Sequence, residues 1–233
     1  MADNAYGIEF LNASELAHAK YSMSECTERM EACQTNTSLC EDALNFCDDN
    51  IASKFAALGR NPYDIRETCD LDDGVKCFHP DDVVDRYLDA PNLRAALGVD
   101  SRIGKWEICN FDVNTDFTKT WDITKSMSDY VAGLLDDGIR VLIYAGDADL
   151  VCNWAGNLAW MKALNWRGAQ EFNESPVRAF VADSGVHAGD VVGHGQFTFM
   201  RVFNAGHTVP QHQPAVSLDM LNRFLQDRSL AQE

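Results

Sequence analysis

The sequence predicts an α/β fold, and three features of the chain indicate it. The run "IRVLIYAG", residues 139–146, is continuous and rich in β-branched side chains, as expected of a parallel strand covered on both faces. A segment of helical periodicity, residues 153–166, comes directly after it, and two more strand-like segments follow. This alternation predicts a parallel sheet with helices on its faces. Near the start, cysteines at seven-residue spacing indicate a separate helical region.

The composition is that of an ordinary globular chain. It has 233 residues, of which 46% are hydrophobic and 24% charged, enough for one sizeable core or a core with a small subdomain. No stretch reaches the length of a membrane span. The net charge of −17 repels nucleic acid and anionic membranes, so we expect neither as a partner.

Residues 13–57 predict a helical region that stops near Gly59. Two short antiparallel helices joined near residues 34–38 would oppose their cysteines in nested pairs. The predicted bridges are Cys26–Cys47 and Cys33–Cys40, with a third local bridge between Cys69 and Cys77. Reduced, buried cysteines in a cytosolic protein are the alternative. We expect no metal site, because no cysteine pair has the spacing of two to four residues that metal sites use.

Disulfides indicate an oxidising compartment, and three N-glycosylation motifs agree with that. The acceptor residues are Asn12, Asn36 and Asn173. We therefore expect a protein of the secretory pathway, either vacuolar or lysosome-like, or extracellular. The opening "MADNAYGIEF" lacks the basic start and apolar run of a signal peptide, so we also expect that a segment is missing upstream.

The middle of the chain predicts short elements. Residues 81–99 form two short helices broken at Pro91, and residues 106–113 are extended. Residues 124–138 form a helix that Gly138 caps.

The last part of the chain predicts two strands and a closing helix. The strands are residues 176–183 and 197–207, joined as a hairpin around residues 185–196. The helix covers residues 214–227. Its apolar stripe is predicted to consist of Leu218, Leu221, Phe224 and Leu225.

Polar side chains follow two of the predicted strands. Asp147 and Asp149 leave the end of the first, and His207 follows a later one. An acid after one strand and a histidine after a later strand is the chain order of the last two members of an α/β-hydrolase triad. The alternatives are a structural histidine and a calcium loop, but a loop from Asp147 would need glycine and glutamate where Cys152 and Leu158 stand.

Several long motifs resemble the serine carboxypeptidase family, in particular its carboxypeptidase Y-like members. They are "VLIYAGDADLVCNWAGNLAW", "FMRVFNAGHTVPQHQPAVSLDMLNRFL", "GRNPYDIRETC", "CFHP" and "EICNFDV". The resemblance covers residues 20–227 and implies part of an α/β-hydrolase fold with a disulfide-stapled helical insertion. It implies that Asp149 is the triad carboxylate and His207 the general base. Asp147 is then a turn residue whose carboxylate accepts backbone N–H bonds.

The resemblance also implies two substrate pockets. The pocket for the residue before the scissile bond would be lined by Trp121, Val151 and Cys152. The pocket for the departing C-terminal residue would be lined by Tyr63, Phe78 and Thr208. Apolar and aromatic linings favour hydrophobic side chains at the C-termini of peptide or protein substrates, with no cofactor. Family members often carry methionine at the position of Thr208.

The nucleophile motif Gly-x-Ser-x-Gly does not occur in the sequence; "ADSGVHAG" comes nearest and lacks the first glycine. The resemblance therefore implies a C-terminal half, in which residues 1–80 are the helical insertion or lid and residues 81–233 the hydrolase core. We expect the serine on a missing N-terminal half or on a companion chain joined through Cys109. The chain alone should be inactive. The alternative is an inactive truncated homologue that acts, if at all, as a binding protein.

Overall fold

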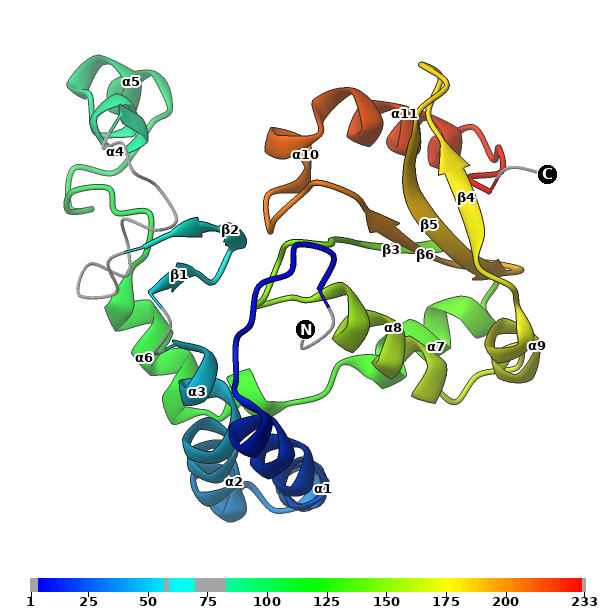
Figure 1. The fold of residues 1–233 in the computed structure, drawn as a ribbon. Helices are drawn as coiled ribbons and strands as arrows, with labels where there is room; N and C mark the ends of the chain where they lie inside the picture. The colour runs from blue at the N-terminus through cyan, green and yellow to red at the C-terminus, as the bar shows by residue number, and fades with distance from the viewer. Residues whose placement is uncertain (1–3, 57–58, 70–82, 232–233) are drawn as a thin grey trace.

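In the computed structural model, residues 4–56, 59–69 and 83–231 are described. Their centre is a four-stranded sheet with the strand order β3-β6-β5-β4 (Figure 1). The strands are β3 (Val141–Gly146), β4 (Arg178–Val181), β5 (His187–His194) and β6 (Phe197–Val202). β3 pairs with β6 in parallel, whereas β5 pairs antiparallel with both β6 and β4.

The predicted hairpin is wrong, because the segment assigned to its loop is itself a strand. β5 lies between β4 and β6 and pairs with both. Its alternation explains this placement: Val191 is buried on one face of the sheet and Val192 on the other. Tight turns at Gly185 and Gly195, both with positive φ, connect it to its neighbours.

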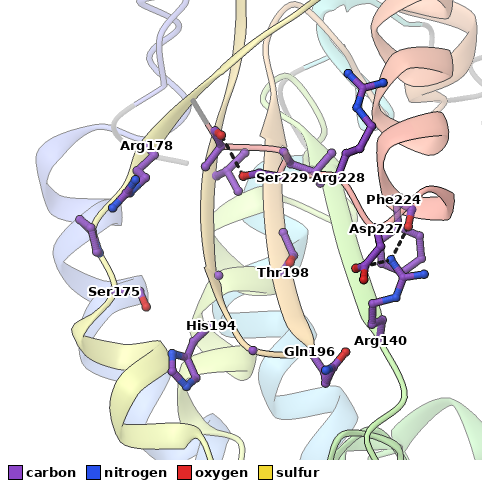
Figure 2. Close-up of a pocket in the computed structure, with 16 residues that line it drawn as sticks. Arg140, Ser175, Arg178, His194, Gln196, Thr198, Phe224, Asp227, Arg228 and Ser229 are labelled. Atoms are coloured by element: carbon purple, nitrogen blue, oxygen red, sulfur yellow. Dashed lines mark hydrogen bonds and ion pairs between the residues drawn. The ribbon is translucent and has the colours of Figure 1, made fainter. Parts of the chain in front are cut away.

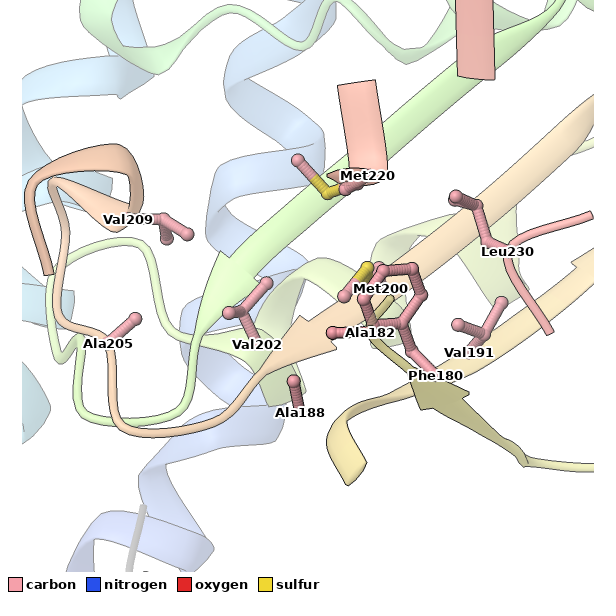
Figure 3. Close-up of a cluster of buried hydrophobic side chains, with 10 residues drawn as sticks. All are labelled: Phe180, Ala182, Ala188, Val191, Met200, Val202, Ala205, Val209, Met220 and Leu230. Atoms are coloured by element: carbon pink, nitrogen blue, oxygen red, sulfur yellow. The ribbon is translucent and has the colours of Figure 1, made fainter. Parts of the chain in front are cut away.

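Helices cover both faces of the sheet (Figure 1). On one face lie α10 (Val209–His212) and α11 (Pro214–Leu225), over a core that includes Phe180, Met200 and Met220 (Figure 3). On the other lie α7 (Ser128–Asp136), α8 (Trp154–Ala163) and α9 (Ala169–Glu174), over a core centred on Phe172, Phe197 and Phe199. The predicted α/β layering and the Gly138 cap of α7 are confirmed.

The predicted apolar stripe of α11 is wrong. Leu218, Leu221 and Leu225 are 59%, 48% and 65% exposed, whereas Met220 is buried against the sheet. The helix carries apolar residues on two sides, and the periodicity of the sequence does not show which side meets the sheet. The side with Met220 does so, together with Val216.

The N-terminal region is helical, as predicted. It comprises α1 (Ala13–Thr35), a 3₁₀ turn (Thr37–Leu39), α2 (Cys40–Cys47), a π-helical turn (Asp48–Ala52) and α3 (Ser53–Ala56). The nested disulfides Cys26–Cys47 and Cys33–Cys40 are both present. Cys69 is also disulfide-bonded, but its predicted partner Cys77 lies outside the described residues.

Along the sequence, the remaining elements lie between the helical region and the sheet. They are β1 (Arg60–Asn61), β2 (Asp64–Thr68), α4 (Val83–Leu88), α5 (Pro91–Ala96), α6 (Phe111–Lys119) and a 3₁₀ turn (Asp122–Thr124). The prediction of an extended segment at 106–113 is wrong, because the side chain of Asn110 accepts a hydrogen bond from the Val113 N–H and starts α6.

The boundary predicted near residue 80 also lies outside the described residues. Among the helices that are described, none combines the length and the apolar character needed to cross a membrane.

Candidate functional site

The carboxyl ends of β3 and β6 carry the candidate site. Because these strands are parallel neighbours, the residues that follow them meet at one edge of the sheet. The pairing continues beyond the strands: Asp147 N–H donates to the Val202 carbonyl and Ala148 N–H to the Ala205 carbonyl, both at 2.9 Å. This places the turn that holds Asp149 beside the turn that holds His207.

Two glycines make this close approach possible. A Cβ on Gly146 would collide with the backbone of Ala205 and Gly206, and a Cβ on Gly206 would collide with the carbonyl of Tyr63. The residue of the second turn with positive φ is Asn204, at 56°. Gly206 is therefore needed for close packing of three backbone segments, and not for the positive φ that a tight turn would require.

Asp149 and His207 form the central pair. Nδ1 of His207 lies 2.9 Å from Oδ2 of Asp149, whose side chain is only 3% exposed. The other oxygen of Asp149 accepts the Cys152 N–H at 3.2 Å. With Asp149 ionised, Nδ1 carries the proton, so the carboxylate selects one imidazole tautomer and stabilises the imidazolium that proton uptake would form.

Tyr63 holds His207 in place from the other side. Its carbonyl accepts the His207 N–H at 2.7 Å, and the two rings meet edge-on with centroids 5.3 Å apart. The His207 side chain is 33% exposed. The imidazole is thus fixed by the backbone, a ring and a carboxylate while part of it faces solvent. Partial burial and the neighbouring Cys109, Asp149 and Cys152 raise the pKa of the Tyr63 hydroxyl.

Asp147 has a different environment. The Tyr6 hydroxyl donates to its Oδ1 at 2.5 Å, and Nη2 of Arg201 lies 3.7 Å from its Oδ2. Burial and the Asp147 carboxylate raise the pKa of Tyr6 above its usual range. The predicted bonds from backbone N–H groups do not form among the described residues; side chains from the N-terminal segment and β6 take their place. Asp147 therefore ties residue 6 to the sheet.

A second buried acid supports the histidine turn and is not evident from the sequence motifs. Asp64 accepts hydrogen bonds from Nε and Nη2 of Arg66, at 2.8 and 2.5 Å. Nε2 of His212 lies 3.5 Å from the same carboxylate, and Nδ1 of His212 accepts the Gly206 N–H at 3.1 Å. Burial acts to raise the pKa of Asp64, but the hydrogen bonds and charge of Arg66 outweigh it, and the pKa is lowered. The Asp-x-Arg pattern in "YDIRE" is the only signal for this network in the sequence.

An apolar cavity of about 840 Å³ opens beside Tyr63. Its other apolar lining comes from α6 and the turn after it, mainly Phe111, Phe117 and Ile123, and Cys109 lies at its edge. A cavity of this size and character suits a hydrophobic side chain of a ligand.

The structure brings together some of the predicted pocket residues. Tyr63 lines the cavity, and Cys152 lies beside Asp149 and His207. The side chain of Trp121 instead packs on the Cys33–Cys40 disulfide, at a residue with φ of 58°.

The other three predictions have different outcomes. Val151 is exposed, and its N–H donates to the Pro62 carbonyl. Thr208 is exposed at the start of α10. Phe78 lies outside the described residues.

One group among the described residues could hold a metal ion. Ligand atoms of Asp149, Cys152 and His207 lie within 4.8 Å of one another. Metal binding would require a thiolate, yet partial burial and the Asp149 carboxylate raise the pKa of the Cys152 thiol. The hydrogen bond between Asp149 and His207 already uses the acid and the imidazole. The arrangement therefore favours proton transfer through His207.

Comparison with known proteins gives the family. The model of the serine carboxypeptidase family matches residues 1–227. Carboxypeptidase Y homolog A from Emericella nidulans is 37% identical over 92% of this chain, and carboxypeptidase Y from Candida albicans is 37% identical over 88%. The matches span 39% and 37% of those proteins, so the chain covers about two fifths of their length.

A solved structure shows the same fold. The crystal structure of Kex1Δp, a prohormone-processing carboxypeptidase from Saccharomyces cerevisiae, superposes with a TM-score of 0.72 at 24% identity, over 94% of this chain and 49% of that one. The four-stranded sheet and its helices are thus part of an α/β-hydrolase fold. Because the family model matches residues 1–227 of the 233, the chain belongs to the serine carboxypeptidase family.

Proposed function

We propose that this chain supplies the general base and its orienting acid to a serine-type carboxypeptidase. The observation that carries the proposal is the 2.9 Å contact between a partly exposed imidazole, His207, and a buried carboxylate, Asp149. The imidazole would accept the serine proton during attack on a C-terminal peptide bond and return it to the leaving amine. Asp149 would hold the tautomer and stabilise the imidazolium.

The substrates would be peptides or proteins with hydrophobic residues at the C-terminus. The apolar cavity between Tyr63 and α6 supports this preference, because apolar surface buried there stabilises an apolar ligand side chain. Val151, Cys152 and Thr208 would complete the binding surface near the reacting bond.

The serine would lie on polypeptide outside these 233 residues, because Gly-x-Ser-x-Gly does not occur within them. Cys109 is exposed and has no disulfide partner among the described residues, so it is available to bond a companion segment. By itself the chain would lack both the nucleophile and the oxyanion hole, and we expect no peptidase activity from it.

The compartment would be an oxidising one, such as a vacuole or the extracellular space. Two disulfides support this proposal, as do the exposed positions of Asn12, Asn36 and Asn173. The Asn36 motif lies at the turn between α1 and α2, where a glycan would point into solvent.

The base–acid pair can be tested without catalysis. In proton NMR of the protein, we expect a far-downfield Nδ1–H resonance that is lost in both H207Q and D149N. The matched control is D147N, which removes a similarly buried carboxylate two residues earlier in the same turn but leaves the resonance in place. A resonance that survives D149N would overturn the assignment of Asp149.

The companion segment can be tested on protein from its natural source. On non-reducing electrophoresis we expect a species heavier than 25.9 kDa, which reduction converts to this chain and a second polypeptide. The second polypeptide should react with a fluorophosphonate probe for activated serines. A single band under both conditions, with no fluorophosphonate labelling, would contradict the proposal and favour the inactive binding protein.

A further inference from the structure

A basic pocket lies at the other end of the sheet from Asp149 and His207. It opens where β3 and β6 begin, next to Arg140 and Gln196, and where β5 ends at His194 (Figure 2). Since Asp149 and His207 follow the opposite ends of β3 and β6, the length of the sheet separates the two places. The pocket has a volume of about 460 Å³, within the range of small-molecule sites.

The pocket is built between the sheet and the segment after α11. Val191, Gly193 and Thr198 form its floor, on the face of the sheet that also carries Met200. Leu230 and Phe224 face them from the C-terminal part of the chain. The pocket therefore continues the core shown in Figure 3 toward solvent, with a rigid strand floor and a covering segment.

The charge of the pocket is opposite to that of the chain. The chain has 36 acidic and 19 basic side chains, yet the pocket lining holds three arginines, a histidine and a single carboxylate. The arginines are Arg140, Arg178 and Arg228, and the carboxylate is Asp227. With His194 neutral, the lining carries a net charge of three minus one, or +2. A concave wall concentrates such a field and attracts anions.

The arginines differ in how they are held. Arg140 donates to the Phe224 carbonyl at 2.5 Å and to Asp227 at 3.0 Å, so its guanidinium is fixed at the wall. Arg178 makes no side-chain hydrogen bond or ion pair with any residue in the described ranges, although the chain is rich in acids. The His194 ring and the Thr198 hydroxyl likewise have no partner there. A cation and two hydrogen-bonding side chains without partners, beside a fixed guanidinium, form a receptive site.

The separation of the arginines sets the shape of the ligand. Arg140 adjoins β3 at one edge of the sheet and Arg178 begins β4 at the other, with Thr198 between them (Figure 2). Three strand spacings of about 4.8 Å put their backbones roughly 14 Å apart. Because Arg140 is held at the wall by the Phe224 carbonyl and Asp227, Arg178 alone would have to cover this distance to share a single phosphate ion. A molecule with anionic groups at two ends meets both arginines where they stand.

We propose that this pocket binds a small organic polyanion that carries two or more phosphate or carboxylate groups. One anionic group pairs with Arg178 and the other with Arg140, and the Thr198 hydroxyl donates to the part between them. Arg228 adds positive charge at the rim, and the neutral His194 ring can donate a hydrogen bond to the ligand. The sequence gives no motif for this site, because its residues come from β4, β5 and β6, from the residue before β3, and from α11 and the segment that follows it.

The test is a titration of the full chain, or of the complex in which it is isolated, with three probes at constant ionic strength. Pyrophosphate, citrate and inorganic phosphate are followed by the rise in melting temperature and by protection of arginines from phenylglyoxal, mapped by mass spectrometry. We expect saturable binding of pyrophosphate or citrate, weaker binding of phosphate, and protection of Arg178 and Arg140. Saturable binding of pyrophosphate but not of citrate would identify phosphate groups as the ligand chemistry. Saturable binding of citrate but not of pyrophosphate would identify carboxylates.

Matched variants separate this site from general charge attraction. R178Q and T198V should each weaken binding of the better probe, R178Q by about tenfold, because it removes a charge-assisted contact. R102Q removes one positive charge from an exposed arginine outside the pocket and should change nothing. No saturation by any probe in the millimolar range would overturn the proposal, as would equal weakening by R178Q and R102Q. This site does not depend on Asp149 or His207, so its failure would leave the proposed peptidase function unaffected.

Discussion

Three buried aspartates surround the candidate site, and each has a different partner. Asp64 meets Arg66, Asp147 meets the Tyr6 hydroxyl, and Asp149 meets His207. Of these partners, the imidazole is the side chain that most often serves as a general base. The geometry of the hydrogen bonds therefore separates two structural acids from the one acid that can support proton transfer, although all three are similarly buried.

The reactivity of Cys152 should report the charge of Asp149. Partial burial and the Asp149 carboxylate raise the pKa of the thiol, so little thiolate forms at neutral pH. D149N removes the charge, lowers that pKa and should speed alkylation by iodoacetamide. The measurement is the alkylation rate against pH in a C109S background, where Cys152 is the only free thiol among the described residues.

The control for this measurement is D147N. It removes a charge from the same turn, but Asp147 does not contribute to the raised pKa of Cys152. We expect its pH–rate profile to match that of the parent protein. An equal acceleration by D147N and D149N would show that loosening of the turn, and not charge, controls the thiol.

Gly146 tests the packing that brings the strand ends together. In G146A the new methyl group would collide with the backbone of Ala205 and Gly206, which cannot move away without displacing His207. We expect a loss of about 1–3 kcal/mol in the free energy of unfolding, measured by chemical denaturation. The matched substitution G133A lies on an exposed turn of α7 with open space around it, and should stabilise by up to about 1 kcal/mol. An unchanged free energy of unfolding in G146A would contradict the packing argument.

For individual residues of the site, the sequence is informative where the order of elements along the chain determines which side chains are in contact. Asp149 and His207 are predictable as neighbours because each follows a strand of the same parallel pair. Tyr6 and His212 are not, because their contacts depend on how the N-terminal segment and α10 return to the sheet. Likewise, Trp121 is close to the cavity in sequence, but its side chain packs on a disulfide.

Among the elements, β2 and α10 are linked through Asp64. Its carboxylate joins Arg66 of β2 to His212 of α10. His212 in turn accepts a hydrogen bond from the Gly206 N–H. Because the folded pKa of Asp64 lies below the unfolded value of about 3.9, the ionised form stabilises the fold. That contribution is present above the unfolded pKa and is lost as pH falls through the folded pKa.

D64N should show this dependence in melting temperature. We expect it to melt well below the parent protein at neutral pH, with a difference that shrinks below about pH 4. D100N is the matched control, because Asp100 and Arg102 have the same i, i+2 spacing but lie exposed to solvent. Its effect should be small and should diminish with salt. A difference between D64N and the parent that stays constant with pH would contradict the ionic account.

The elements themselves show which patterns can be read from a sequence. Cysteines at heptad spacing correctly predict two helices and their bridges, because the pattern specifies one helix face. The α11 pattern fails because two faces are apolar, and only packing selects the one with Met220. The sequence of β5 does not indicate a strand, because its glycines and histidines have little β propensity. Its place between two strands supplies the stability that its own sequence lacks.

Across the whole molecule, the sheet has an unpaired edge. β3 pairs only with β6 in the described part of the chain, although its apolar sequence predicts a neighbour on each side. Tyr144 of β3 is 42% exposed, and Phe111 and Phe117 of α6 are also exposed. An open edge with apolar surface favours pairing with another chain.

We therefore expect the chain, when produced alone, to self-associate through this edge. The edge variant Y144K should reduce association in sedimentation velocity, because a lysine on an edge strand opposes pairing with a second strand. Y130K makes the same change at an exposed tyrosine on a helix, α7, whose backbone is already hydrogen-bonded, and should leave association unchanged. A monomer with a cooperative melt would show that the edge is stable without a partner. Equal effects of Y144K and Y130K would show that net charge, and not the β3 edge, controls association.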